Sequence, residues 1–272
     1  MATPPEPRVV LLTGCSTGIG LAAAMAFASA GGWATLATMR SPDAAPAALT
    51  TLPGVEVLSL DVTSEASVEA VMEHVRRAHG GRLDVVVNNA GYGVPGSIET
   101  VPLAAAQDVF DVNVWGSVRV LRAALPLMRA RGEGVVVQVS STSGTRAVPF
   151  SDVYCGSKFA IEGMLESLRY ALAPDERMVA PEAQDAAEVA AVIVRAATDR
   201  LGGGDPSAAP FRVGTGDAAS AVLAAVRRDV DGRSGPVYEA QWSKVHAEVR
   251  RVDAEVAAAN AAVASEASTA GE

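Results

Sequence analysis

Aromatic residues and cysteines are scarce in this chain. Phe, Trp and Tyr make up 4% of its 272 residues while 49% are hydrophobic, so the core must be built from Ala, Val and Leu rather than around large rings. The two cysteines, Cys15 and Cys155, are far apart in the sequence and form no cluster with metal-ligand spacing. We interpret both as ordinary small residues, which suits a reducing compartment and predicts no metal site.

Basic charge and long apolar runs are lacking as well. The net charge of −9 at pH 7 argues against a surface for nucleic acid or anionic membranes. No stretch reaches the roughly 18 apolar residues of a membrane span, and the first residues, MATPPEPR, show no basic start followed by an apolar run. We therefore expect a cytoplasmic protein that binds neither nucleic acid nor membrane and whose partner is a small molecule.

What the chain does contain is a regular alternation of short apolar runs and helical stretches. The runs are β-branched and continuously apolar, as are strands that are covered on both faces. The expected strands are residues 8–13, 33–38, 55–60, 83–88 and 134–140, and the expected helices are 21–30, 65–78 (capped by Ser64), 103–131 and 152–173. This order predicts an α/β fold, a Rossmann-type doubly wound parallel sheet with right-handed crossovers.

The last thirty residues differ in composition from the rest. From Trp242 to Val263, apolar residues recur at spacings of three and four on a segment rich in Ala, Glu and Arg. We expect one nucleotide-binding domain over residues 1–240, followed over 241–272 by a terminal helix with a frayed tail. That helix is expected to pack on its own domain, because Val and Ala bury too little area to favour the alternative, an intermolecular coiled coil.

A glycine-rich turn, TGCSTGIG at residues 13–20, follows the first expected strand. Glycines let the backbone turn tightly and approach a pyrophosphate, while the next helix offers its N-terminal amides and the positive end of its dipole. A tight strand-to-helix connection is the alternative, but the position between a strand and a helix favours dinucleotide binding. The expected cofactor-binding residues of this turn are Gly14, Ser16, Thr17, Gly18, Ile19 and Gly20.

The end of the second strand indicates which dinucleotide is preferred. An acidic residue there would accept hydrogen bonds from the adenosine ribose, whereas an arginine pairs with a 2′-phosphate. The sequence ATMRSPD places Arg40 at this point, and a guanidinium can hold a phosphate through two contacts. We therefore predict NADP(H) rather than NAD(H), with Ser16 as an additional hydroxyl donor, while the nearby Asp43 keeps NAD(H) as the alternative.

Further candidates follow the third and fourth strands. Asp61 and Val62 come directly after the third, and Asn89, Ala90 and Gly91 come after the fourth. The carboxyl ends of the strands form the edge of an open parallel sheet at which ligands bind. Each residue could instead cap the segment that follows it. Because all of them fall at the same edge, we predict that they contact the cofactor.

A possible acid/base group lies beyond the fifth strand. Ser141 follows this strand, Tyr154 comes thirteen residues later, and Lys158 stands four further on, on the same helical face as the tyrosine. A free tyrosine has a pKa of about 10. We expect the Lys158 ammonium, together with the positive nicotinamide of an oxidised cofactor, to lower the pKa of Tyr154 and make its phenol an acid/base group near neutral pH. Ser141 would hold the substrate oxygen beside that phenol.

These motifs together resemble the classical short-chain dehydrogenases/reductases. The segments that carry the resemblance are TGCSTGIG, NNAG (88–91), FDVNVWG (110–116) with Asn113, VQVSSTSG (137–144) and YCGSK (154–158), in the family's order over residues 8–173. The stretch around YCGSK looks most like the branch that contains 17β-hydroxysteroid and retinol dehydrogenases.

The resemblance implies a role for each of these residues. Tyr154 would give or take the proton, Ser141 would orient the carbonyl or alcohol, and Lys158 would hold the nicotinamide ribose and tune Tyr154. Asn113 would anchor a proton relay through water. The resemblance further implies hydride transfer at the nicotinamide and assembly as a homodimer or homotetramer through the helices at 103–131 and 152–173.

One part of the family's pattern is not found. After the helix at 152–173 the family has a sixth strand and a Pro-Gly turn that contacts the nicotinamide, whereas this chain reads LAPDERMVAPEAQ. We therefore expect an internal deletion near 174–181 and a sheet one strand short of the family's seven. Since an open place beside the fifth strand would leave amides unpaired, we expect residues 210–214 to fill it, with a helix at 182–200 as the crossover. The alternative is that only this sequence lacks the segment and the native protein is a complete enzyme.

The motifs thus predict an NADP(H)-dependent oxidoreductase that interconverts a ketone or aldehyde with an alcohol. A non-catalytic NADP-binding protein is the alternative, because the nicotinamide and substrate segment is not found. A nucleotide-sugar epimerase or dehydratase, which shares the tyrosine and lysine, is a weaker alternative, since such enzymes have a larger C-terminal substrate region.

Overall fold

A computed structural model describes residues 6–171, 176–182, 186–201 and 212–214. All of them belong to one compact unit, Met1–Val222. The expected domain boundary at residue 240 and the terminal helix at 241–272 lie outside the described residues. Among the helices of the described ranges, none has both the length and the apolar character needed to cross a bilayer.

A parallel sheet of seven strands forms the centre of the unit, in the order β3-β2-β1-β4-β5-β6-β7. The strands are β1 (Arg8–Leu12), β2 (Trp33–Met39), β3 (Val55–Ser59), β4 (Val85–Asn88), β5 (Gly134–Gln138), β6 (Glu176–Glu182) and β7 (Arg212–Gly214). Strand β1 lies between β2 and β4, so the chain winds outward from it in both directions. The expected Rossmann-type doubly wound fold is confirmed.

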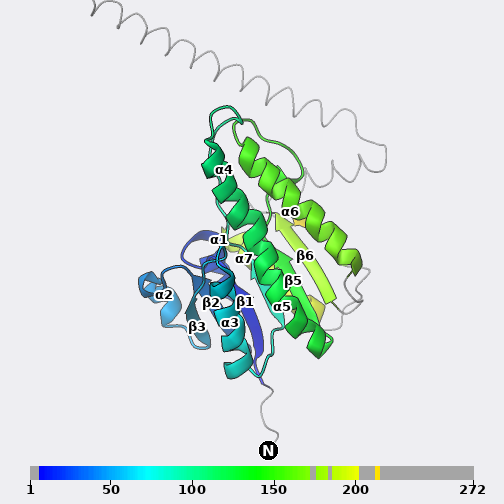
Figure 1. Ribbon diagram of the computed structural model, residues 1–272. Coiled ribbons are helices and arrows are strands. Elements are labelled where there is room, and N and C mark those ends of the chain that lie inside the picture. The colour runs from blue at the N-terminus through cyan, green and yellow to red at the C-terminus, as the bar shows by residue number, and fades with distance from the viewer. Residues whose placement is uncertain (1–5, 172–175, 183–185, 202–211, 215–272) are drawn as a thin grey trace, which may run out of the picture. The chain divides into compact units, whose positions relative to one another are not determined.

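Helices cover both faces of the sheet, with α3, α5 and α6 on one face and α1 and α7 on the other (Figure 1). The α-helices are α1 (Gly18–Ala30), α2 (Ala47–Thr50), α3 (Glu65–Ala78), α4 (Leu103–Phe110), α5 (Ser117–Arg131), α6 (Asp152–Ala171) and α7 (Ala186–Leu201). Short 3₁₀ segments are η1 (Pro42–Ala44) and η3 (Thr142–Gly144), and η2 (Asp111–Gly116) is a π-helical segment. Val, Leu and Ala side chains fill both interfaces, as the shortage of aromatics predicts.

Helix α3 is defined at both ends by local interactions. The Ser64 hydroxyl accepts a hydrogen bond from the Ser67 amide (3.2 Å), which confirms the predicted cap. At the other end His79 is the C-cap, and the chain turns away through Gly80 and Gly81, both at positive φ. The helix therefore runs from the carboxyl end of β3 back towards the amino ends of the strands.

The expectation of a missing strand is wrong. Residues 176–182, which lie where an internal deletion near 174–181 was expected and were not recognised as a strand, form β6 and pair with β5 in parallel, from Gly134 opposite Glu176 to Val137 opposite Val179. The sheet therefore has its sixth strand, while the deletion itself stays a prediction. Residues 212–214 do not lie beside β5, as expected, but pair with β6. The charged start and Pro181 obscured the strand in the sequence. Pro181 lies beyond Val179, the last residue of the strand that pairs with β5, so its missing N–H removes no bond from that pairing.

Candidate active site

A cavity of about 880 Å³ lies at the carboxyl edge of β1, β2, β4 and β5. It brings together most of the residues that the sequence predicted. These are Gly14, Ser16, Thr17, Gly18, Ile19, Arg40, Asp61, Val62, Asn89, Ala90, Gly91, Ser141, Tyr154 and Lys158. Two predicted residues, Gly20 and Asn113, are not part of this lining and lie behind it.

Close packing between the glycine turn and the end of β4 explains two of the glycines. A Cβ on Gly20 would lie 2.3 Å from the Gly14 carbonyl oxygen and 2.4 Å from Asn89 Nδ2. Gly14 has a φ of +71°, and a Cβ there would lie 2.9 Å from the Ala90 Cα. The turn can therefore approach β4 only with glycine at both positions.

The N-terminus of α1 opens onto the cavity with its amides available. Within the described part of the chain, the Thr17 side chain makes no capping hydrogen bond, and the first turn of α1 carries no acidic residue. A Cβ added to Gly18 would meet no described atom within 4 Å, so the space above the turn is free. Unpaired amides at the positive end of a helix dipole fit a pyrophosphate. The residues at this end of the cavity therefore fit a dinucleotide.

Thr13, which the sequence did not single out, holds the turn and β4 together. Its buried hydroxyl accepts hydrogen bonds from the backbone amides of Asn89 and Ala90, both at 3.0 Å. The Asn89 side chain in turn donates to the carbonyl oxygens of Thr13 (2.8 Å) and Gly14 (3.1 Å). A threonine directly before the first glycine was the only available signal.

Asp61 and Arg40 form the charged end of the cavity. Oδ1 of Asp61 accepts hydrogen bonds from the Thr63 amide (2.9 Å) and hydroxyl (2.7 Å), so the residue also closes a local turn. These bonds, chiefly, and the charge of Arg40 lower the pKa of Asp61, which keeps it ionised. Arg40 is exposed and lines the cavity at the end of β2.

Tyr154 lies on the first turn of α6, facing Ser141 from η3. Burial raises the pKa of Tyr154 above its ordinary value, and a hydrogen bond with the Ser141 side chain opposes that rise. The direction is opposite to the one expected from the sequence. Lys158, whose Nζ lies 5.6 Å from the centre of the Tyr154 ring, is not among the causes of the shift. The protein groups alone therefore keep the phenol protonated at neutral pH.

Lys158 is a buried lysine, with 5% of its surface exposed. Burial lowers the pKa of its ammonium to about 8, although the charge of Glu162, one turn further along α6, acts in the opposite direction. Its Nζ donates to the carbonyl oxygen of Val139 (3.1 Å), which fixes the amine at the end of β5. A buried amine with a lowered pKa, next to a phenol in a cavity, is typical of catalytic sites.

Asn113 lies in η2, the π-helical segment between α4 and α5, and fastens the loop after β4. Its Oδ1 accepts from the Tyr92 amide (3.0 Å), while its Nδ2 donates to the Tyr92 carbonyl (2.8 Å) and to Ser157 Oγ (3.0 Å). Ser157 donates to the Tyr154 carbonyl (2.8 Å), so the chain of contacts reaches α6. The sequence predicted one long helix here and gave no sign of the wider turn, which is common at functional sites.

Taken together, a dinucleotide-sized cavity at the carboxyl edge of a doubly wound sheet and the Ser141, Tyr154 and Lys158 cluster define a Rossmann-type oxidoreductase. The family model described as short chain dehydrogenase matches residues 8–189, and the chain belongs to this family. The resemblance that the sequence motifs suggested is thereby confirmed.

Curated relatives include members of the branch indicated by the sequence. The chain is 46% identical over 175 residues to "17-beta-hydroxysteroid dehydrogenase type 1" of Homo sapiens, an alignment that covers 61% of this chain and 52% of the relative. It is 44% identical over 170 residues to "Retinol dehydrogenase 8" of Bos taurus, with 60% and 53% covered. The chain thus spans about half the length of these relatives.

Solved structures of the same family superpose over more of the chain. A short-chain dehydrogenase from Streptomyces avermitilis is 28% identical, with a TM-score of 0.75 over 90% of this chain and 98% of that one. A metagenomic short-chain oxidoreductase in complex with NADP is 27% identical, with a TM-score of 0.68 over 77% of this chain and 97% of that one.

Proposed function

We propose that this protein is an NADP(H)-dependent oxidoreductase that interconverts a ketone or aldehyde with an alcohol, with Tyr154 as the general acid/base. The observation that carries the proposal is the convergence of Ser141, Tyr154 and Lys158 on one wall of the cavity that the uncapped end of α1 also borders. The relatives named above, each a dehydrogenase, support the same reaction class.

The cofactor would lie along the carboxyl edge of the sheet. The amides at Thr17 and Gly18 would hold its pyrophosphate, and Asp61, Asn89 and Ala90 would border its adenosine half and its centre. Arg40 favours NADP(H), because it is the exposed cation at the end of β2. When bound, the nicotinamide supplies or accepts the hydride at the carbonyl carbon.

The protein's own groups would handle the proton. The Tyr154 hydroxyl gives its proton to the substrate oxygen in reduction and takes one back in oxidation, while the Ser141 hydroxyl positions that oxygen beside it. Because burial raises the pKa of Tyr154, the phenol is protonated at neutral pH and holds the proton that reduction of a carbonyl would consume. Lys158 would anchor the ribose, and Asn113 would connect the site to a proton relay through water.

We further propose a bulky apolar alcohol or ketone as substrate, in line with the names of the relatives. The exposed side chain of Tyr92, which lines the cavity, offers apolar surface there. The exposed Trp115, Phe159 and Met164 on η2 and α6 support a homodimer or homotetramer. A cytoplasmic location remains part of the proposal.

A second function, NADP binding without turnover, is favoured by one observation. Among the described residues, none after Lys158 lines the cavity, although the resemblance assigns the nicotinamide amide and the substrate to segments beyond it. A chain built in this way could hold the adenosine half of the dinucleotide and still fail to align the nicotinamide.

Titration of the purified full chain with NADPH and NADH, followed by absorbance assays with ketones, steroids and retinoids, separates the two functions. We expect NADPH binding and turnover, with turnover reduced about 10²- to 10⁴-fold in Tyr154→Phe while NADPH binding persists. Binding without turnover of any compound would support the second function. Turnover that Tyr154→Phe leaves unchanged would contradict the assigned role of the phenol.

A further inference from the structure

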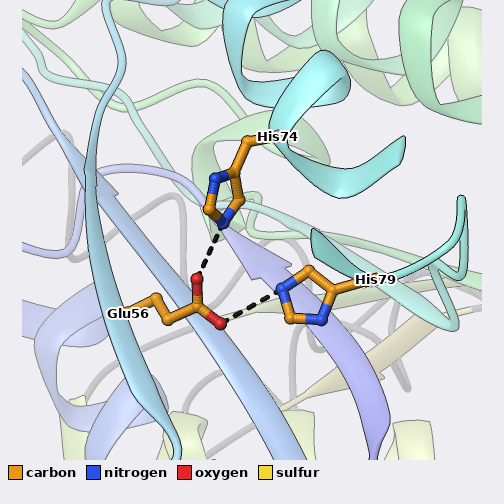
Figure 2. A group of neighbouring side chains, drawn as sticks. All are labelled: Glu56, His74 and His79. Atoms are coloured by element: carbon orange, nitrogen blue, oxygen red, sulfur yellow. Dashed lines mark hydrogen bonds and ion pairs between the residues drawn. The ribbon is translucent and has the colours of Figure 1, made fainter. Parts of the chain in front are cut away.

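Three potential metal ligands meet between the edge strand β3 and the C-terminal end of α3, outside the cavity. His74 projects from α3 and His79 from its C-cap towards Glu56 on β3 (Figure 2). His74 Nε2 lies 2.7 Å from Glu56 Oε2, and His79 Nε2 lies 3.1 Å from Glu56 Oε1. Two of the chain's three histidines thus converge on one carboxylate.

Local structure explains why these three side chains meet. Strand β3 is the edge strand, and α3 returns along it, so the last turns of the helix pass the beginning of the strand. His74 is in the second half of α3, and the turn through Gly80 and Gly81 starts directly after His79. This cluster could not be recognised in the sequence. Glu56 and His74 are 18 residues apart, His74 and His79 are 5 apart, and no short motif contains all three.

The ligand set and its spacing suit a first-row divalent cation such as Zn²⁺. Two imidazole nitrogens and a carboxylate oxygen are a common three-residue set for zinc, with water in the fourth position. The three ligand atoms lie within 4.8 Å of one another, whereas ligands of a tetrahedral zinc ion are about 3.3 Å apart. Small rotations of the His74 and Glu56 side chains, which are 34% and 37% exposed, would close this difference.

Two further observations favour a cation at this point. Among the described residues, the buried Nε2 of His79 has no hydrogen-bond partner besides its ion-pair approach to Glu56 Oε1 at 3.1 Å. The cluster also lies at the C-terminus of α3, the negative end of the helix dipole. An unsatisfied nitrogen, a carboxylate and a negative dipole end all gain from a positive ion.

We propose that Glu56, His74 and His79 form a binding site for one divalent transition-metal ion, with Zn²⁺ as the best-fitting example. The ion would tie the edge strand β3 to the end of α3 and so stabilise this corner of the fold. The site is structural rather than catalytic, because Glu56 is four residues, roughly 13 Å, before Leu60, where the cavity lining of this segment begins. The proposal does not depend on the proposed function.

Calorimetric titration of the metal-free full chain with ZnCl₂ tests the site. We expect one equivalent of Zn²⁺ to bind, with the affinity reduced at least about tenfold in each of Glu56→Gln, His74→Gln and His79→Gln. At a free Zn²⁺ concentration about 100 times the dissociation constant, the melting temperature should rise by about 5 °C in the wild type and not in His79→Gln. Titration with Co²⁺ should give the intense visible bands of a four-coordinate site.

Matched controls separate this site from unspecific binding. Glu73→Gln removes a carboxylate of α3 that pairs with Arg77, and His246→Gln removes the third histidine, so both should bind Zn²⁺ as the wild type does. Far-UV circular dichroism and thermal melting of the three ligand variants without Zn²⁺, measured in parallel, show whether they are folded. The proposal is overturned if the wild type takes up no stoichiometric Zn²⁺, or if the three ligand variants bind it as tightly as the controls.

Discussion

Two groups of strands, β1, β4 and β5 on the one hand and β6 and β7 on the other, differ in what their residues contribute to the site. On the side of β1, β4 and β5, each strand runs directly into polar or glycine residues whose partners can be named, and these residues line the cavity. On the side of β6 and β7, the strands complete the sheet by backbone pairing, yet none of the described residues there lines the cavity. In the described part of the chain, β6 and β7 therefore serve the sheet by backbone pairing, whereas the residues that follow β1, β4 and β5 serve the cavity.

Proline substitutions in β6 should have the largest effect, because they test whether this strand stabilises the sheet through its backbone. Successive N–H groups of a strand point to opposite sides, so one of Met178→Pro and Val179→Pro must remove an N–H that faces β5. That variant should lose about 3 kcal/mol or more of the free energy of unfolding, measured by urea denaturation.

Alanine variants at the same two positions provide the control, because they shorten the side chain and retain the N–H. If both proline variants unfold at the same urea concentration as their alanine counterparts, β6 does not contribute its backbone to the sheet. In that case β6 would contribute neither to the stability of the sheet nor to the lining of the cavity.

Removal of the Thr13 hydroxyl tests whether the polar contacts between the ends of β1 and β4 stabilise the protein. Thr13→Val would leave the amides of Asn89 and Ala90 without their acceptor, at a cost of about 2 to 4 kcal/mol in the free energy of unfolding. Thr35→Val is the matched control, since among the described residues nothing hydrogen-bonds the buried Thr35 hydroxyl. Equal urea midpoints for the two variants would contradict the structural role of Thr13.

Arg40→Ala tests whether a residue that follows β2 distinguishes NADPH from NADH. Loss of a charged contact with the 2′-phosphate should weaken NADPH binding about 10- to 100-fold and leave NADH binding unchanged, as measured by fluorescence titration. Arg76→Ala, which removes an arginine of α3 outside the cavity lining, should change neither affinity. Parallel weakening of both dinucleotides would show that Arg40 does not read the phosphate.

Lys158 should leave a pH signature of its own. Its folded pKa of about 8 lies below the ordinary 10.5, so between these values the unfolded chain binds the extra proton and the folded protein does not. Stability should therefore gain from this group as the pH rises from 8 to 10.5, and this gain is lost as the pH falls through 8. The wild type minus Lys158→Met difference in the free energy of unfolding should grow by roughly 1 to 3 kcal/mol over that range. A difference that stays flat would refute the burial of a titrating amine.

The residues that the sequence identified correctly share a local cause. A Cβ on Gly20 would collide with the Gly14 carbonyl oxygen of the same turn, and the Ser64 cap belongs to the helix that follows it. Strands β2, β4 and β5 were recognised because both of their faces are buried, which makes them largely apolar.

What the sequence missed depends on tertiary context. Strand β6 has a short apolar centre between charged residues and a proline, and its pairing partner is forty residues away. The contacts of Thr13 and the Glu56 cluster join side chains that only the fold brings together. Burial, which a sequence does not display, outweighs the hydrogen bond with Ser141 and raises the pKa of Tyr154 in the protein alone, whereas the expected lowering includes the charge of an oxidised nicotinamide.

The π-helical turn at Asp111–Gly116 has a consequence for changes in chain length. A π turn accommodates one residue more than an α-helical turn, so every side chain beyond it is rotated by about 100° from where an unbroken helix would place it. Deleting a single residue here would give a more regular helix and at the same time turn either Asn113 away from Tyr92 or the buried face of α5 away from the sheet. This is the point in the long helical segment where a shorter chain would be locally more stable and globally misassembled.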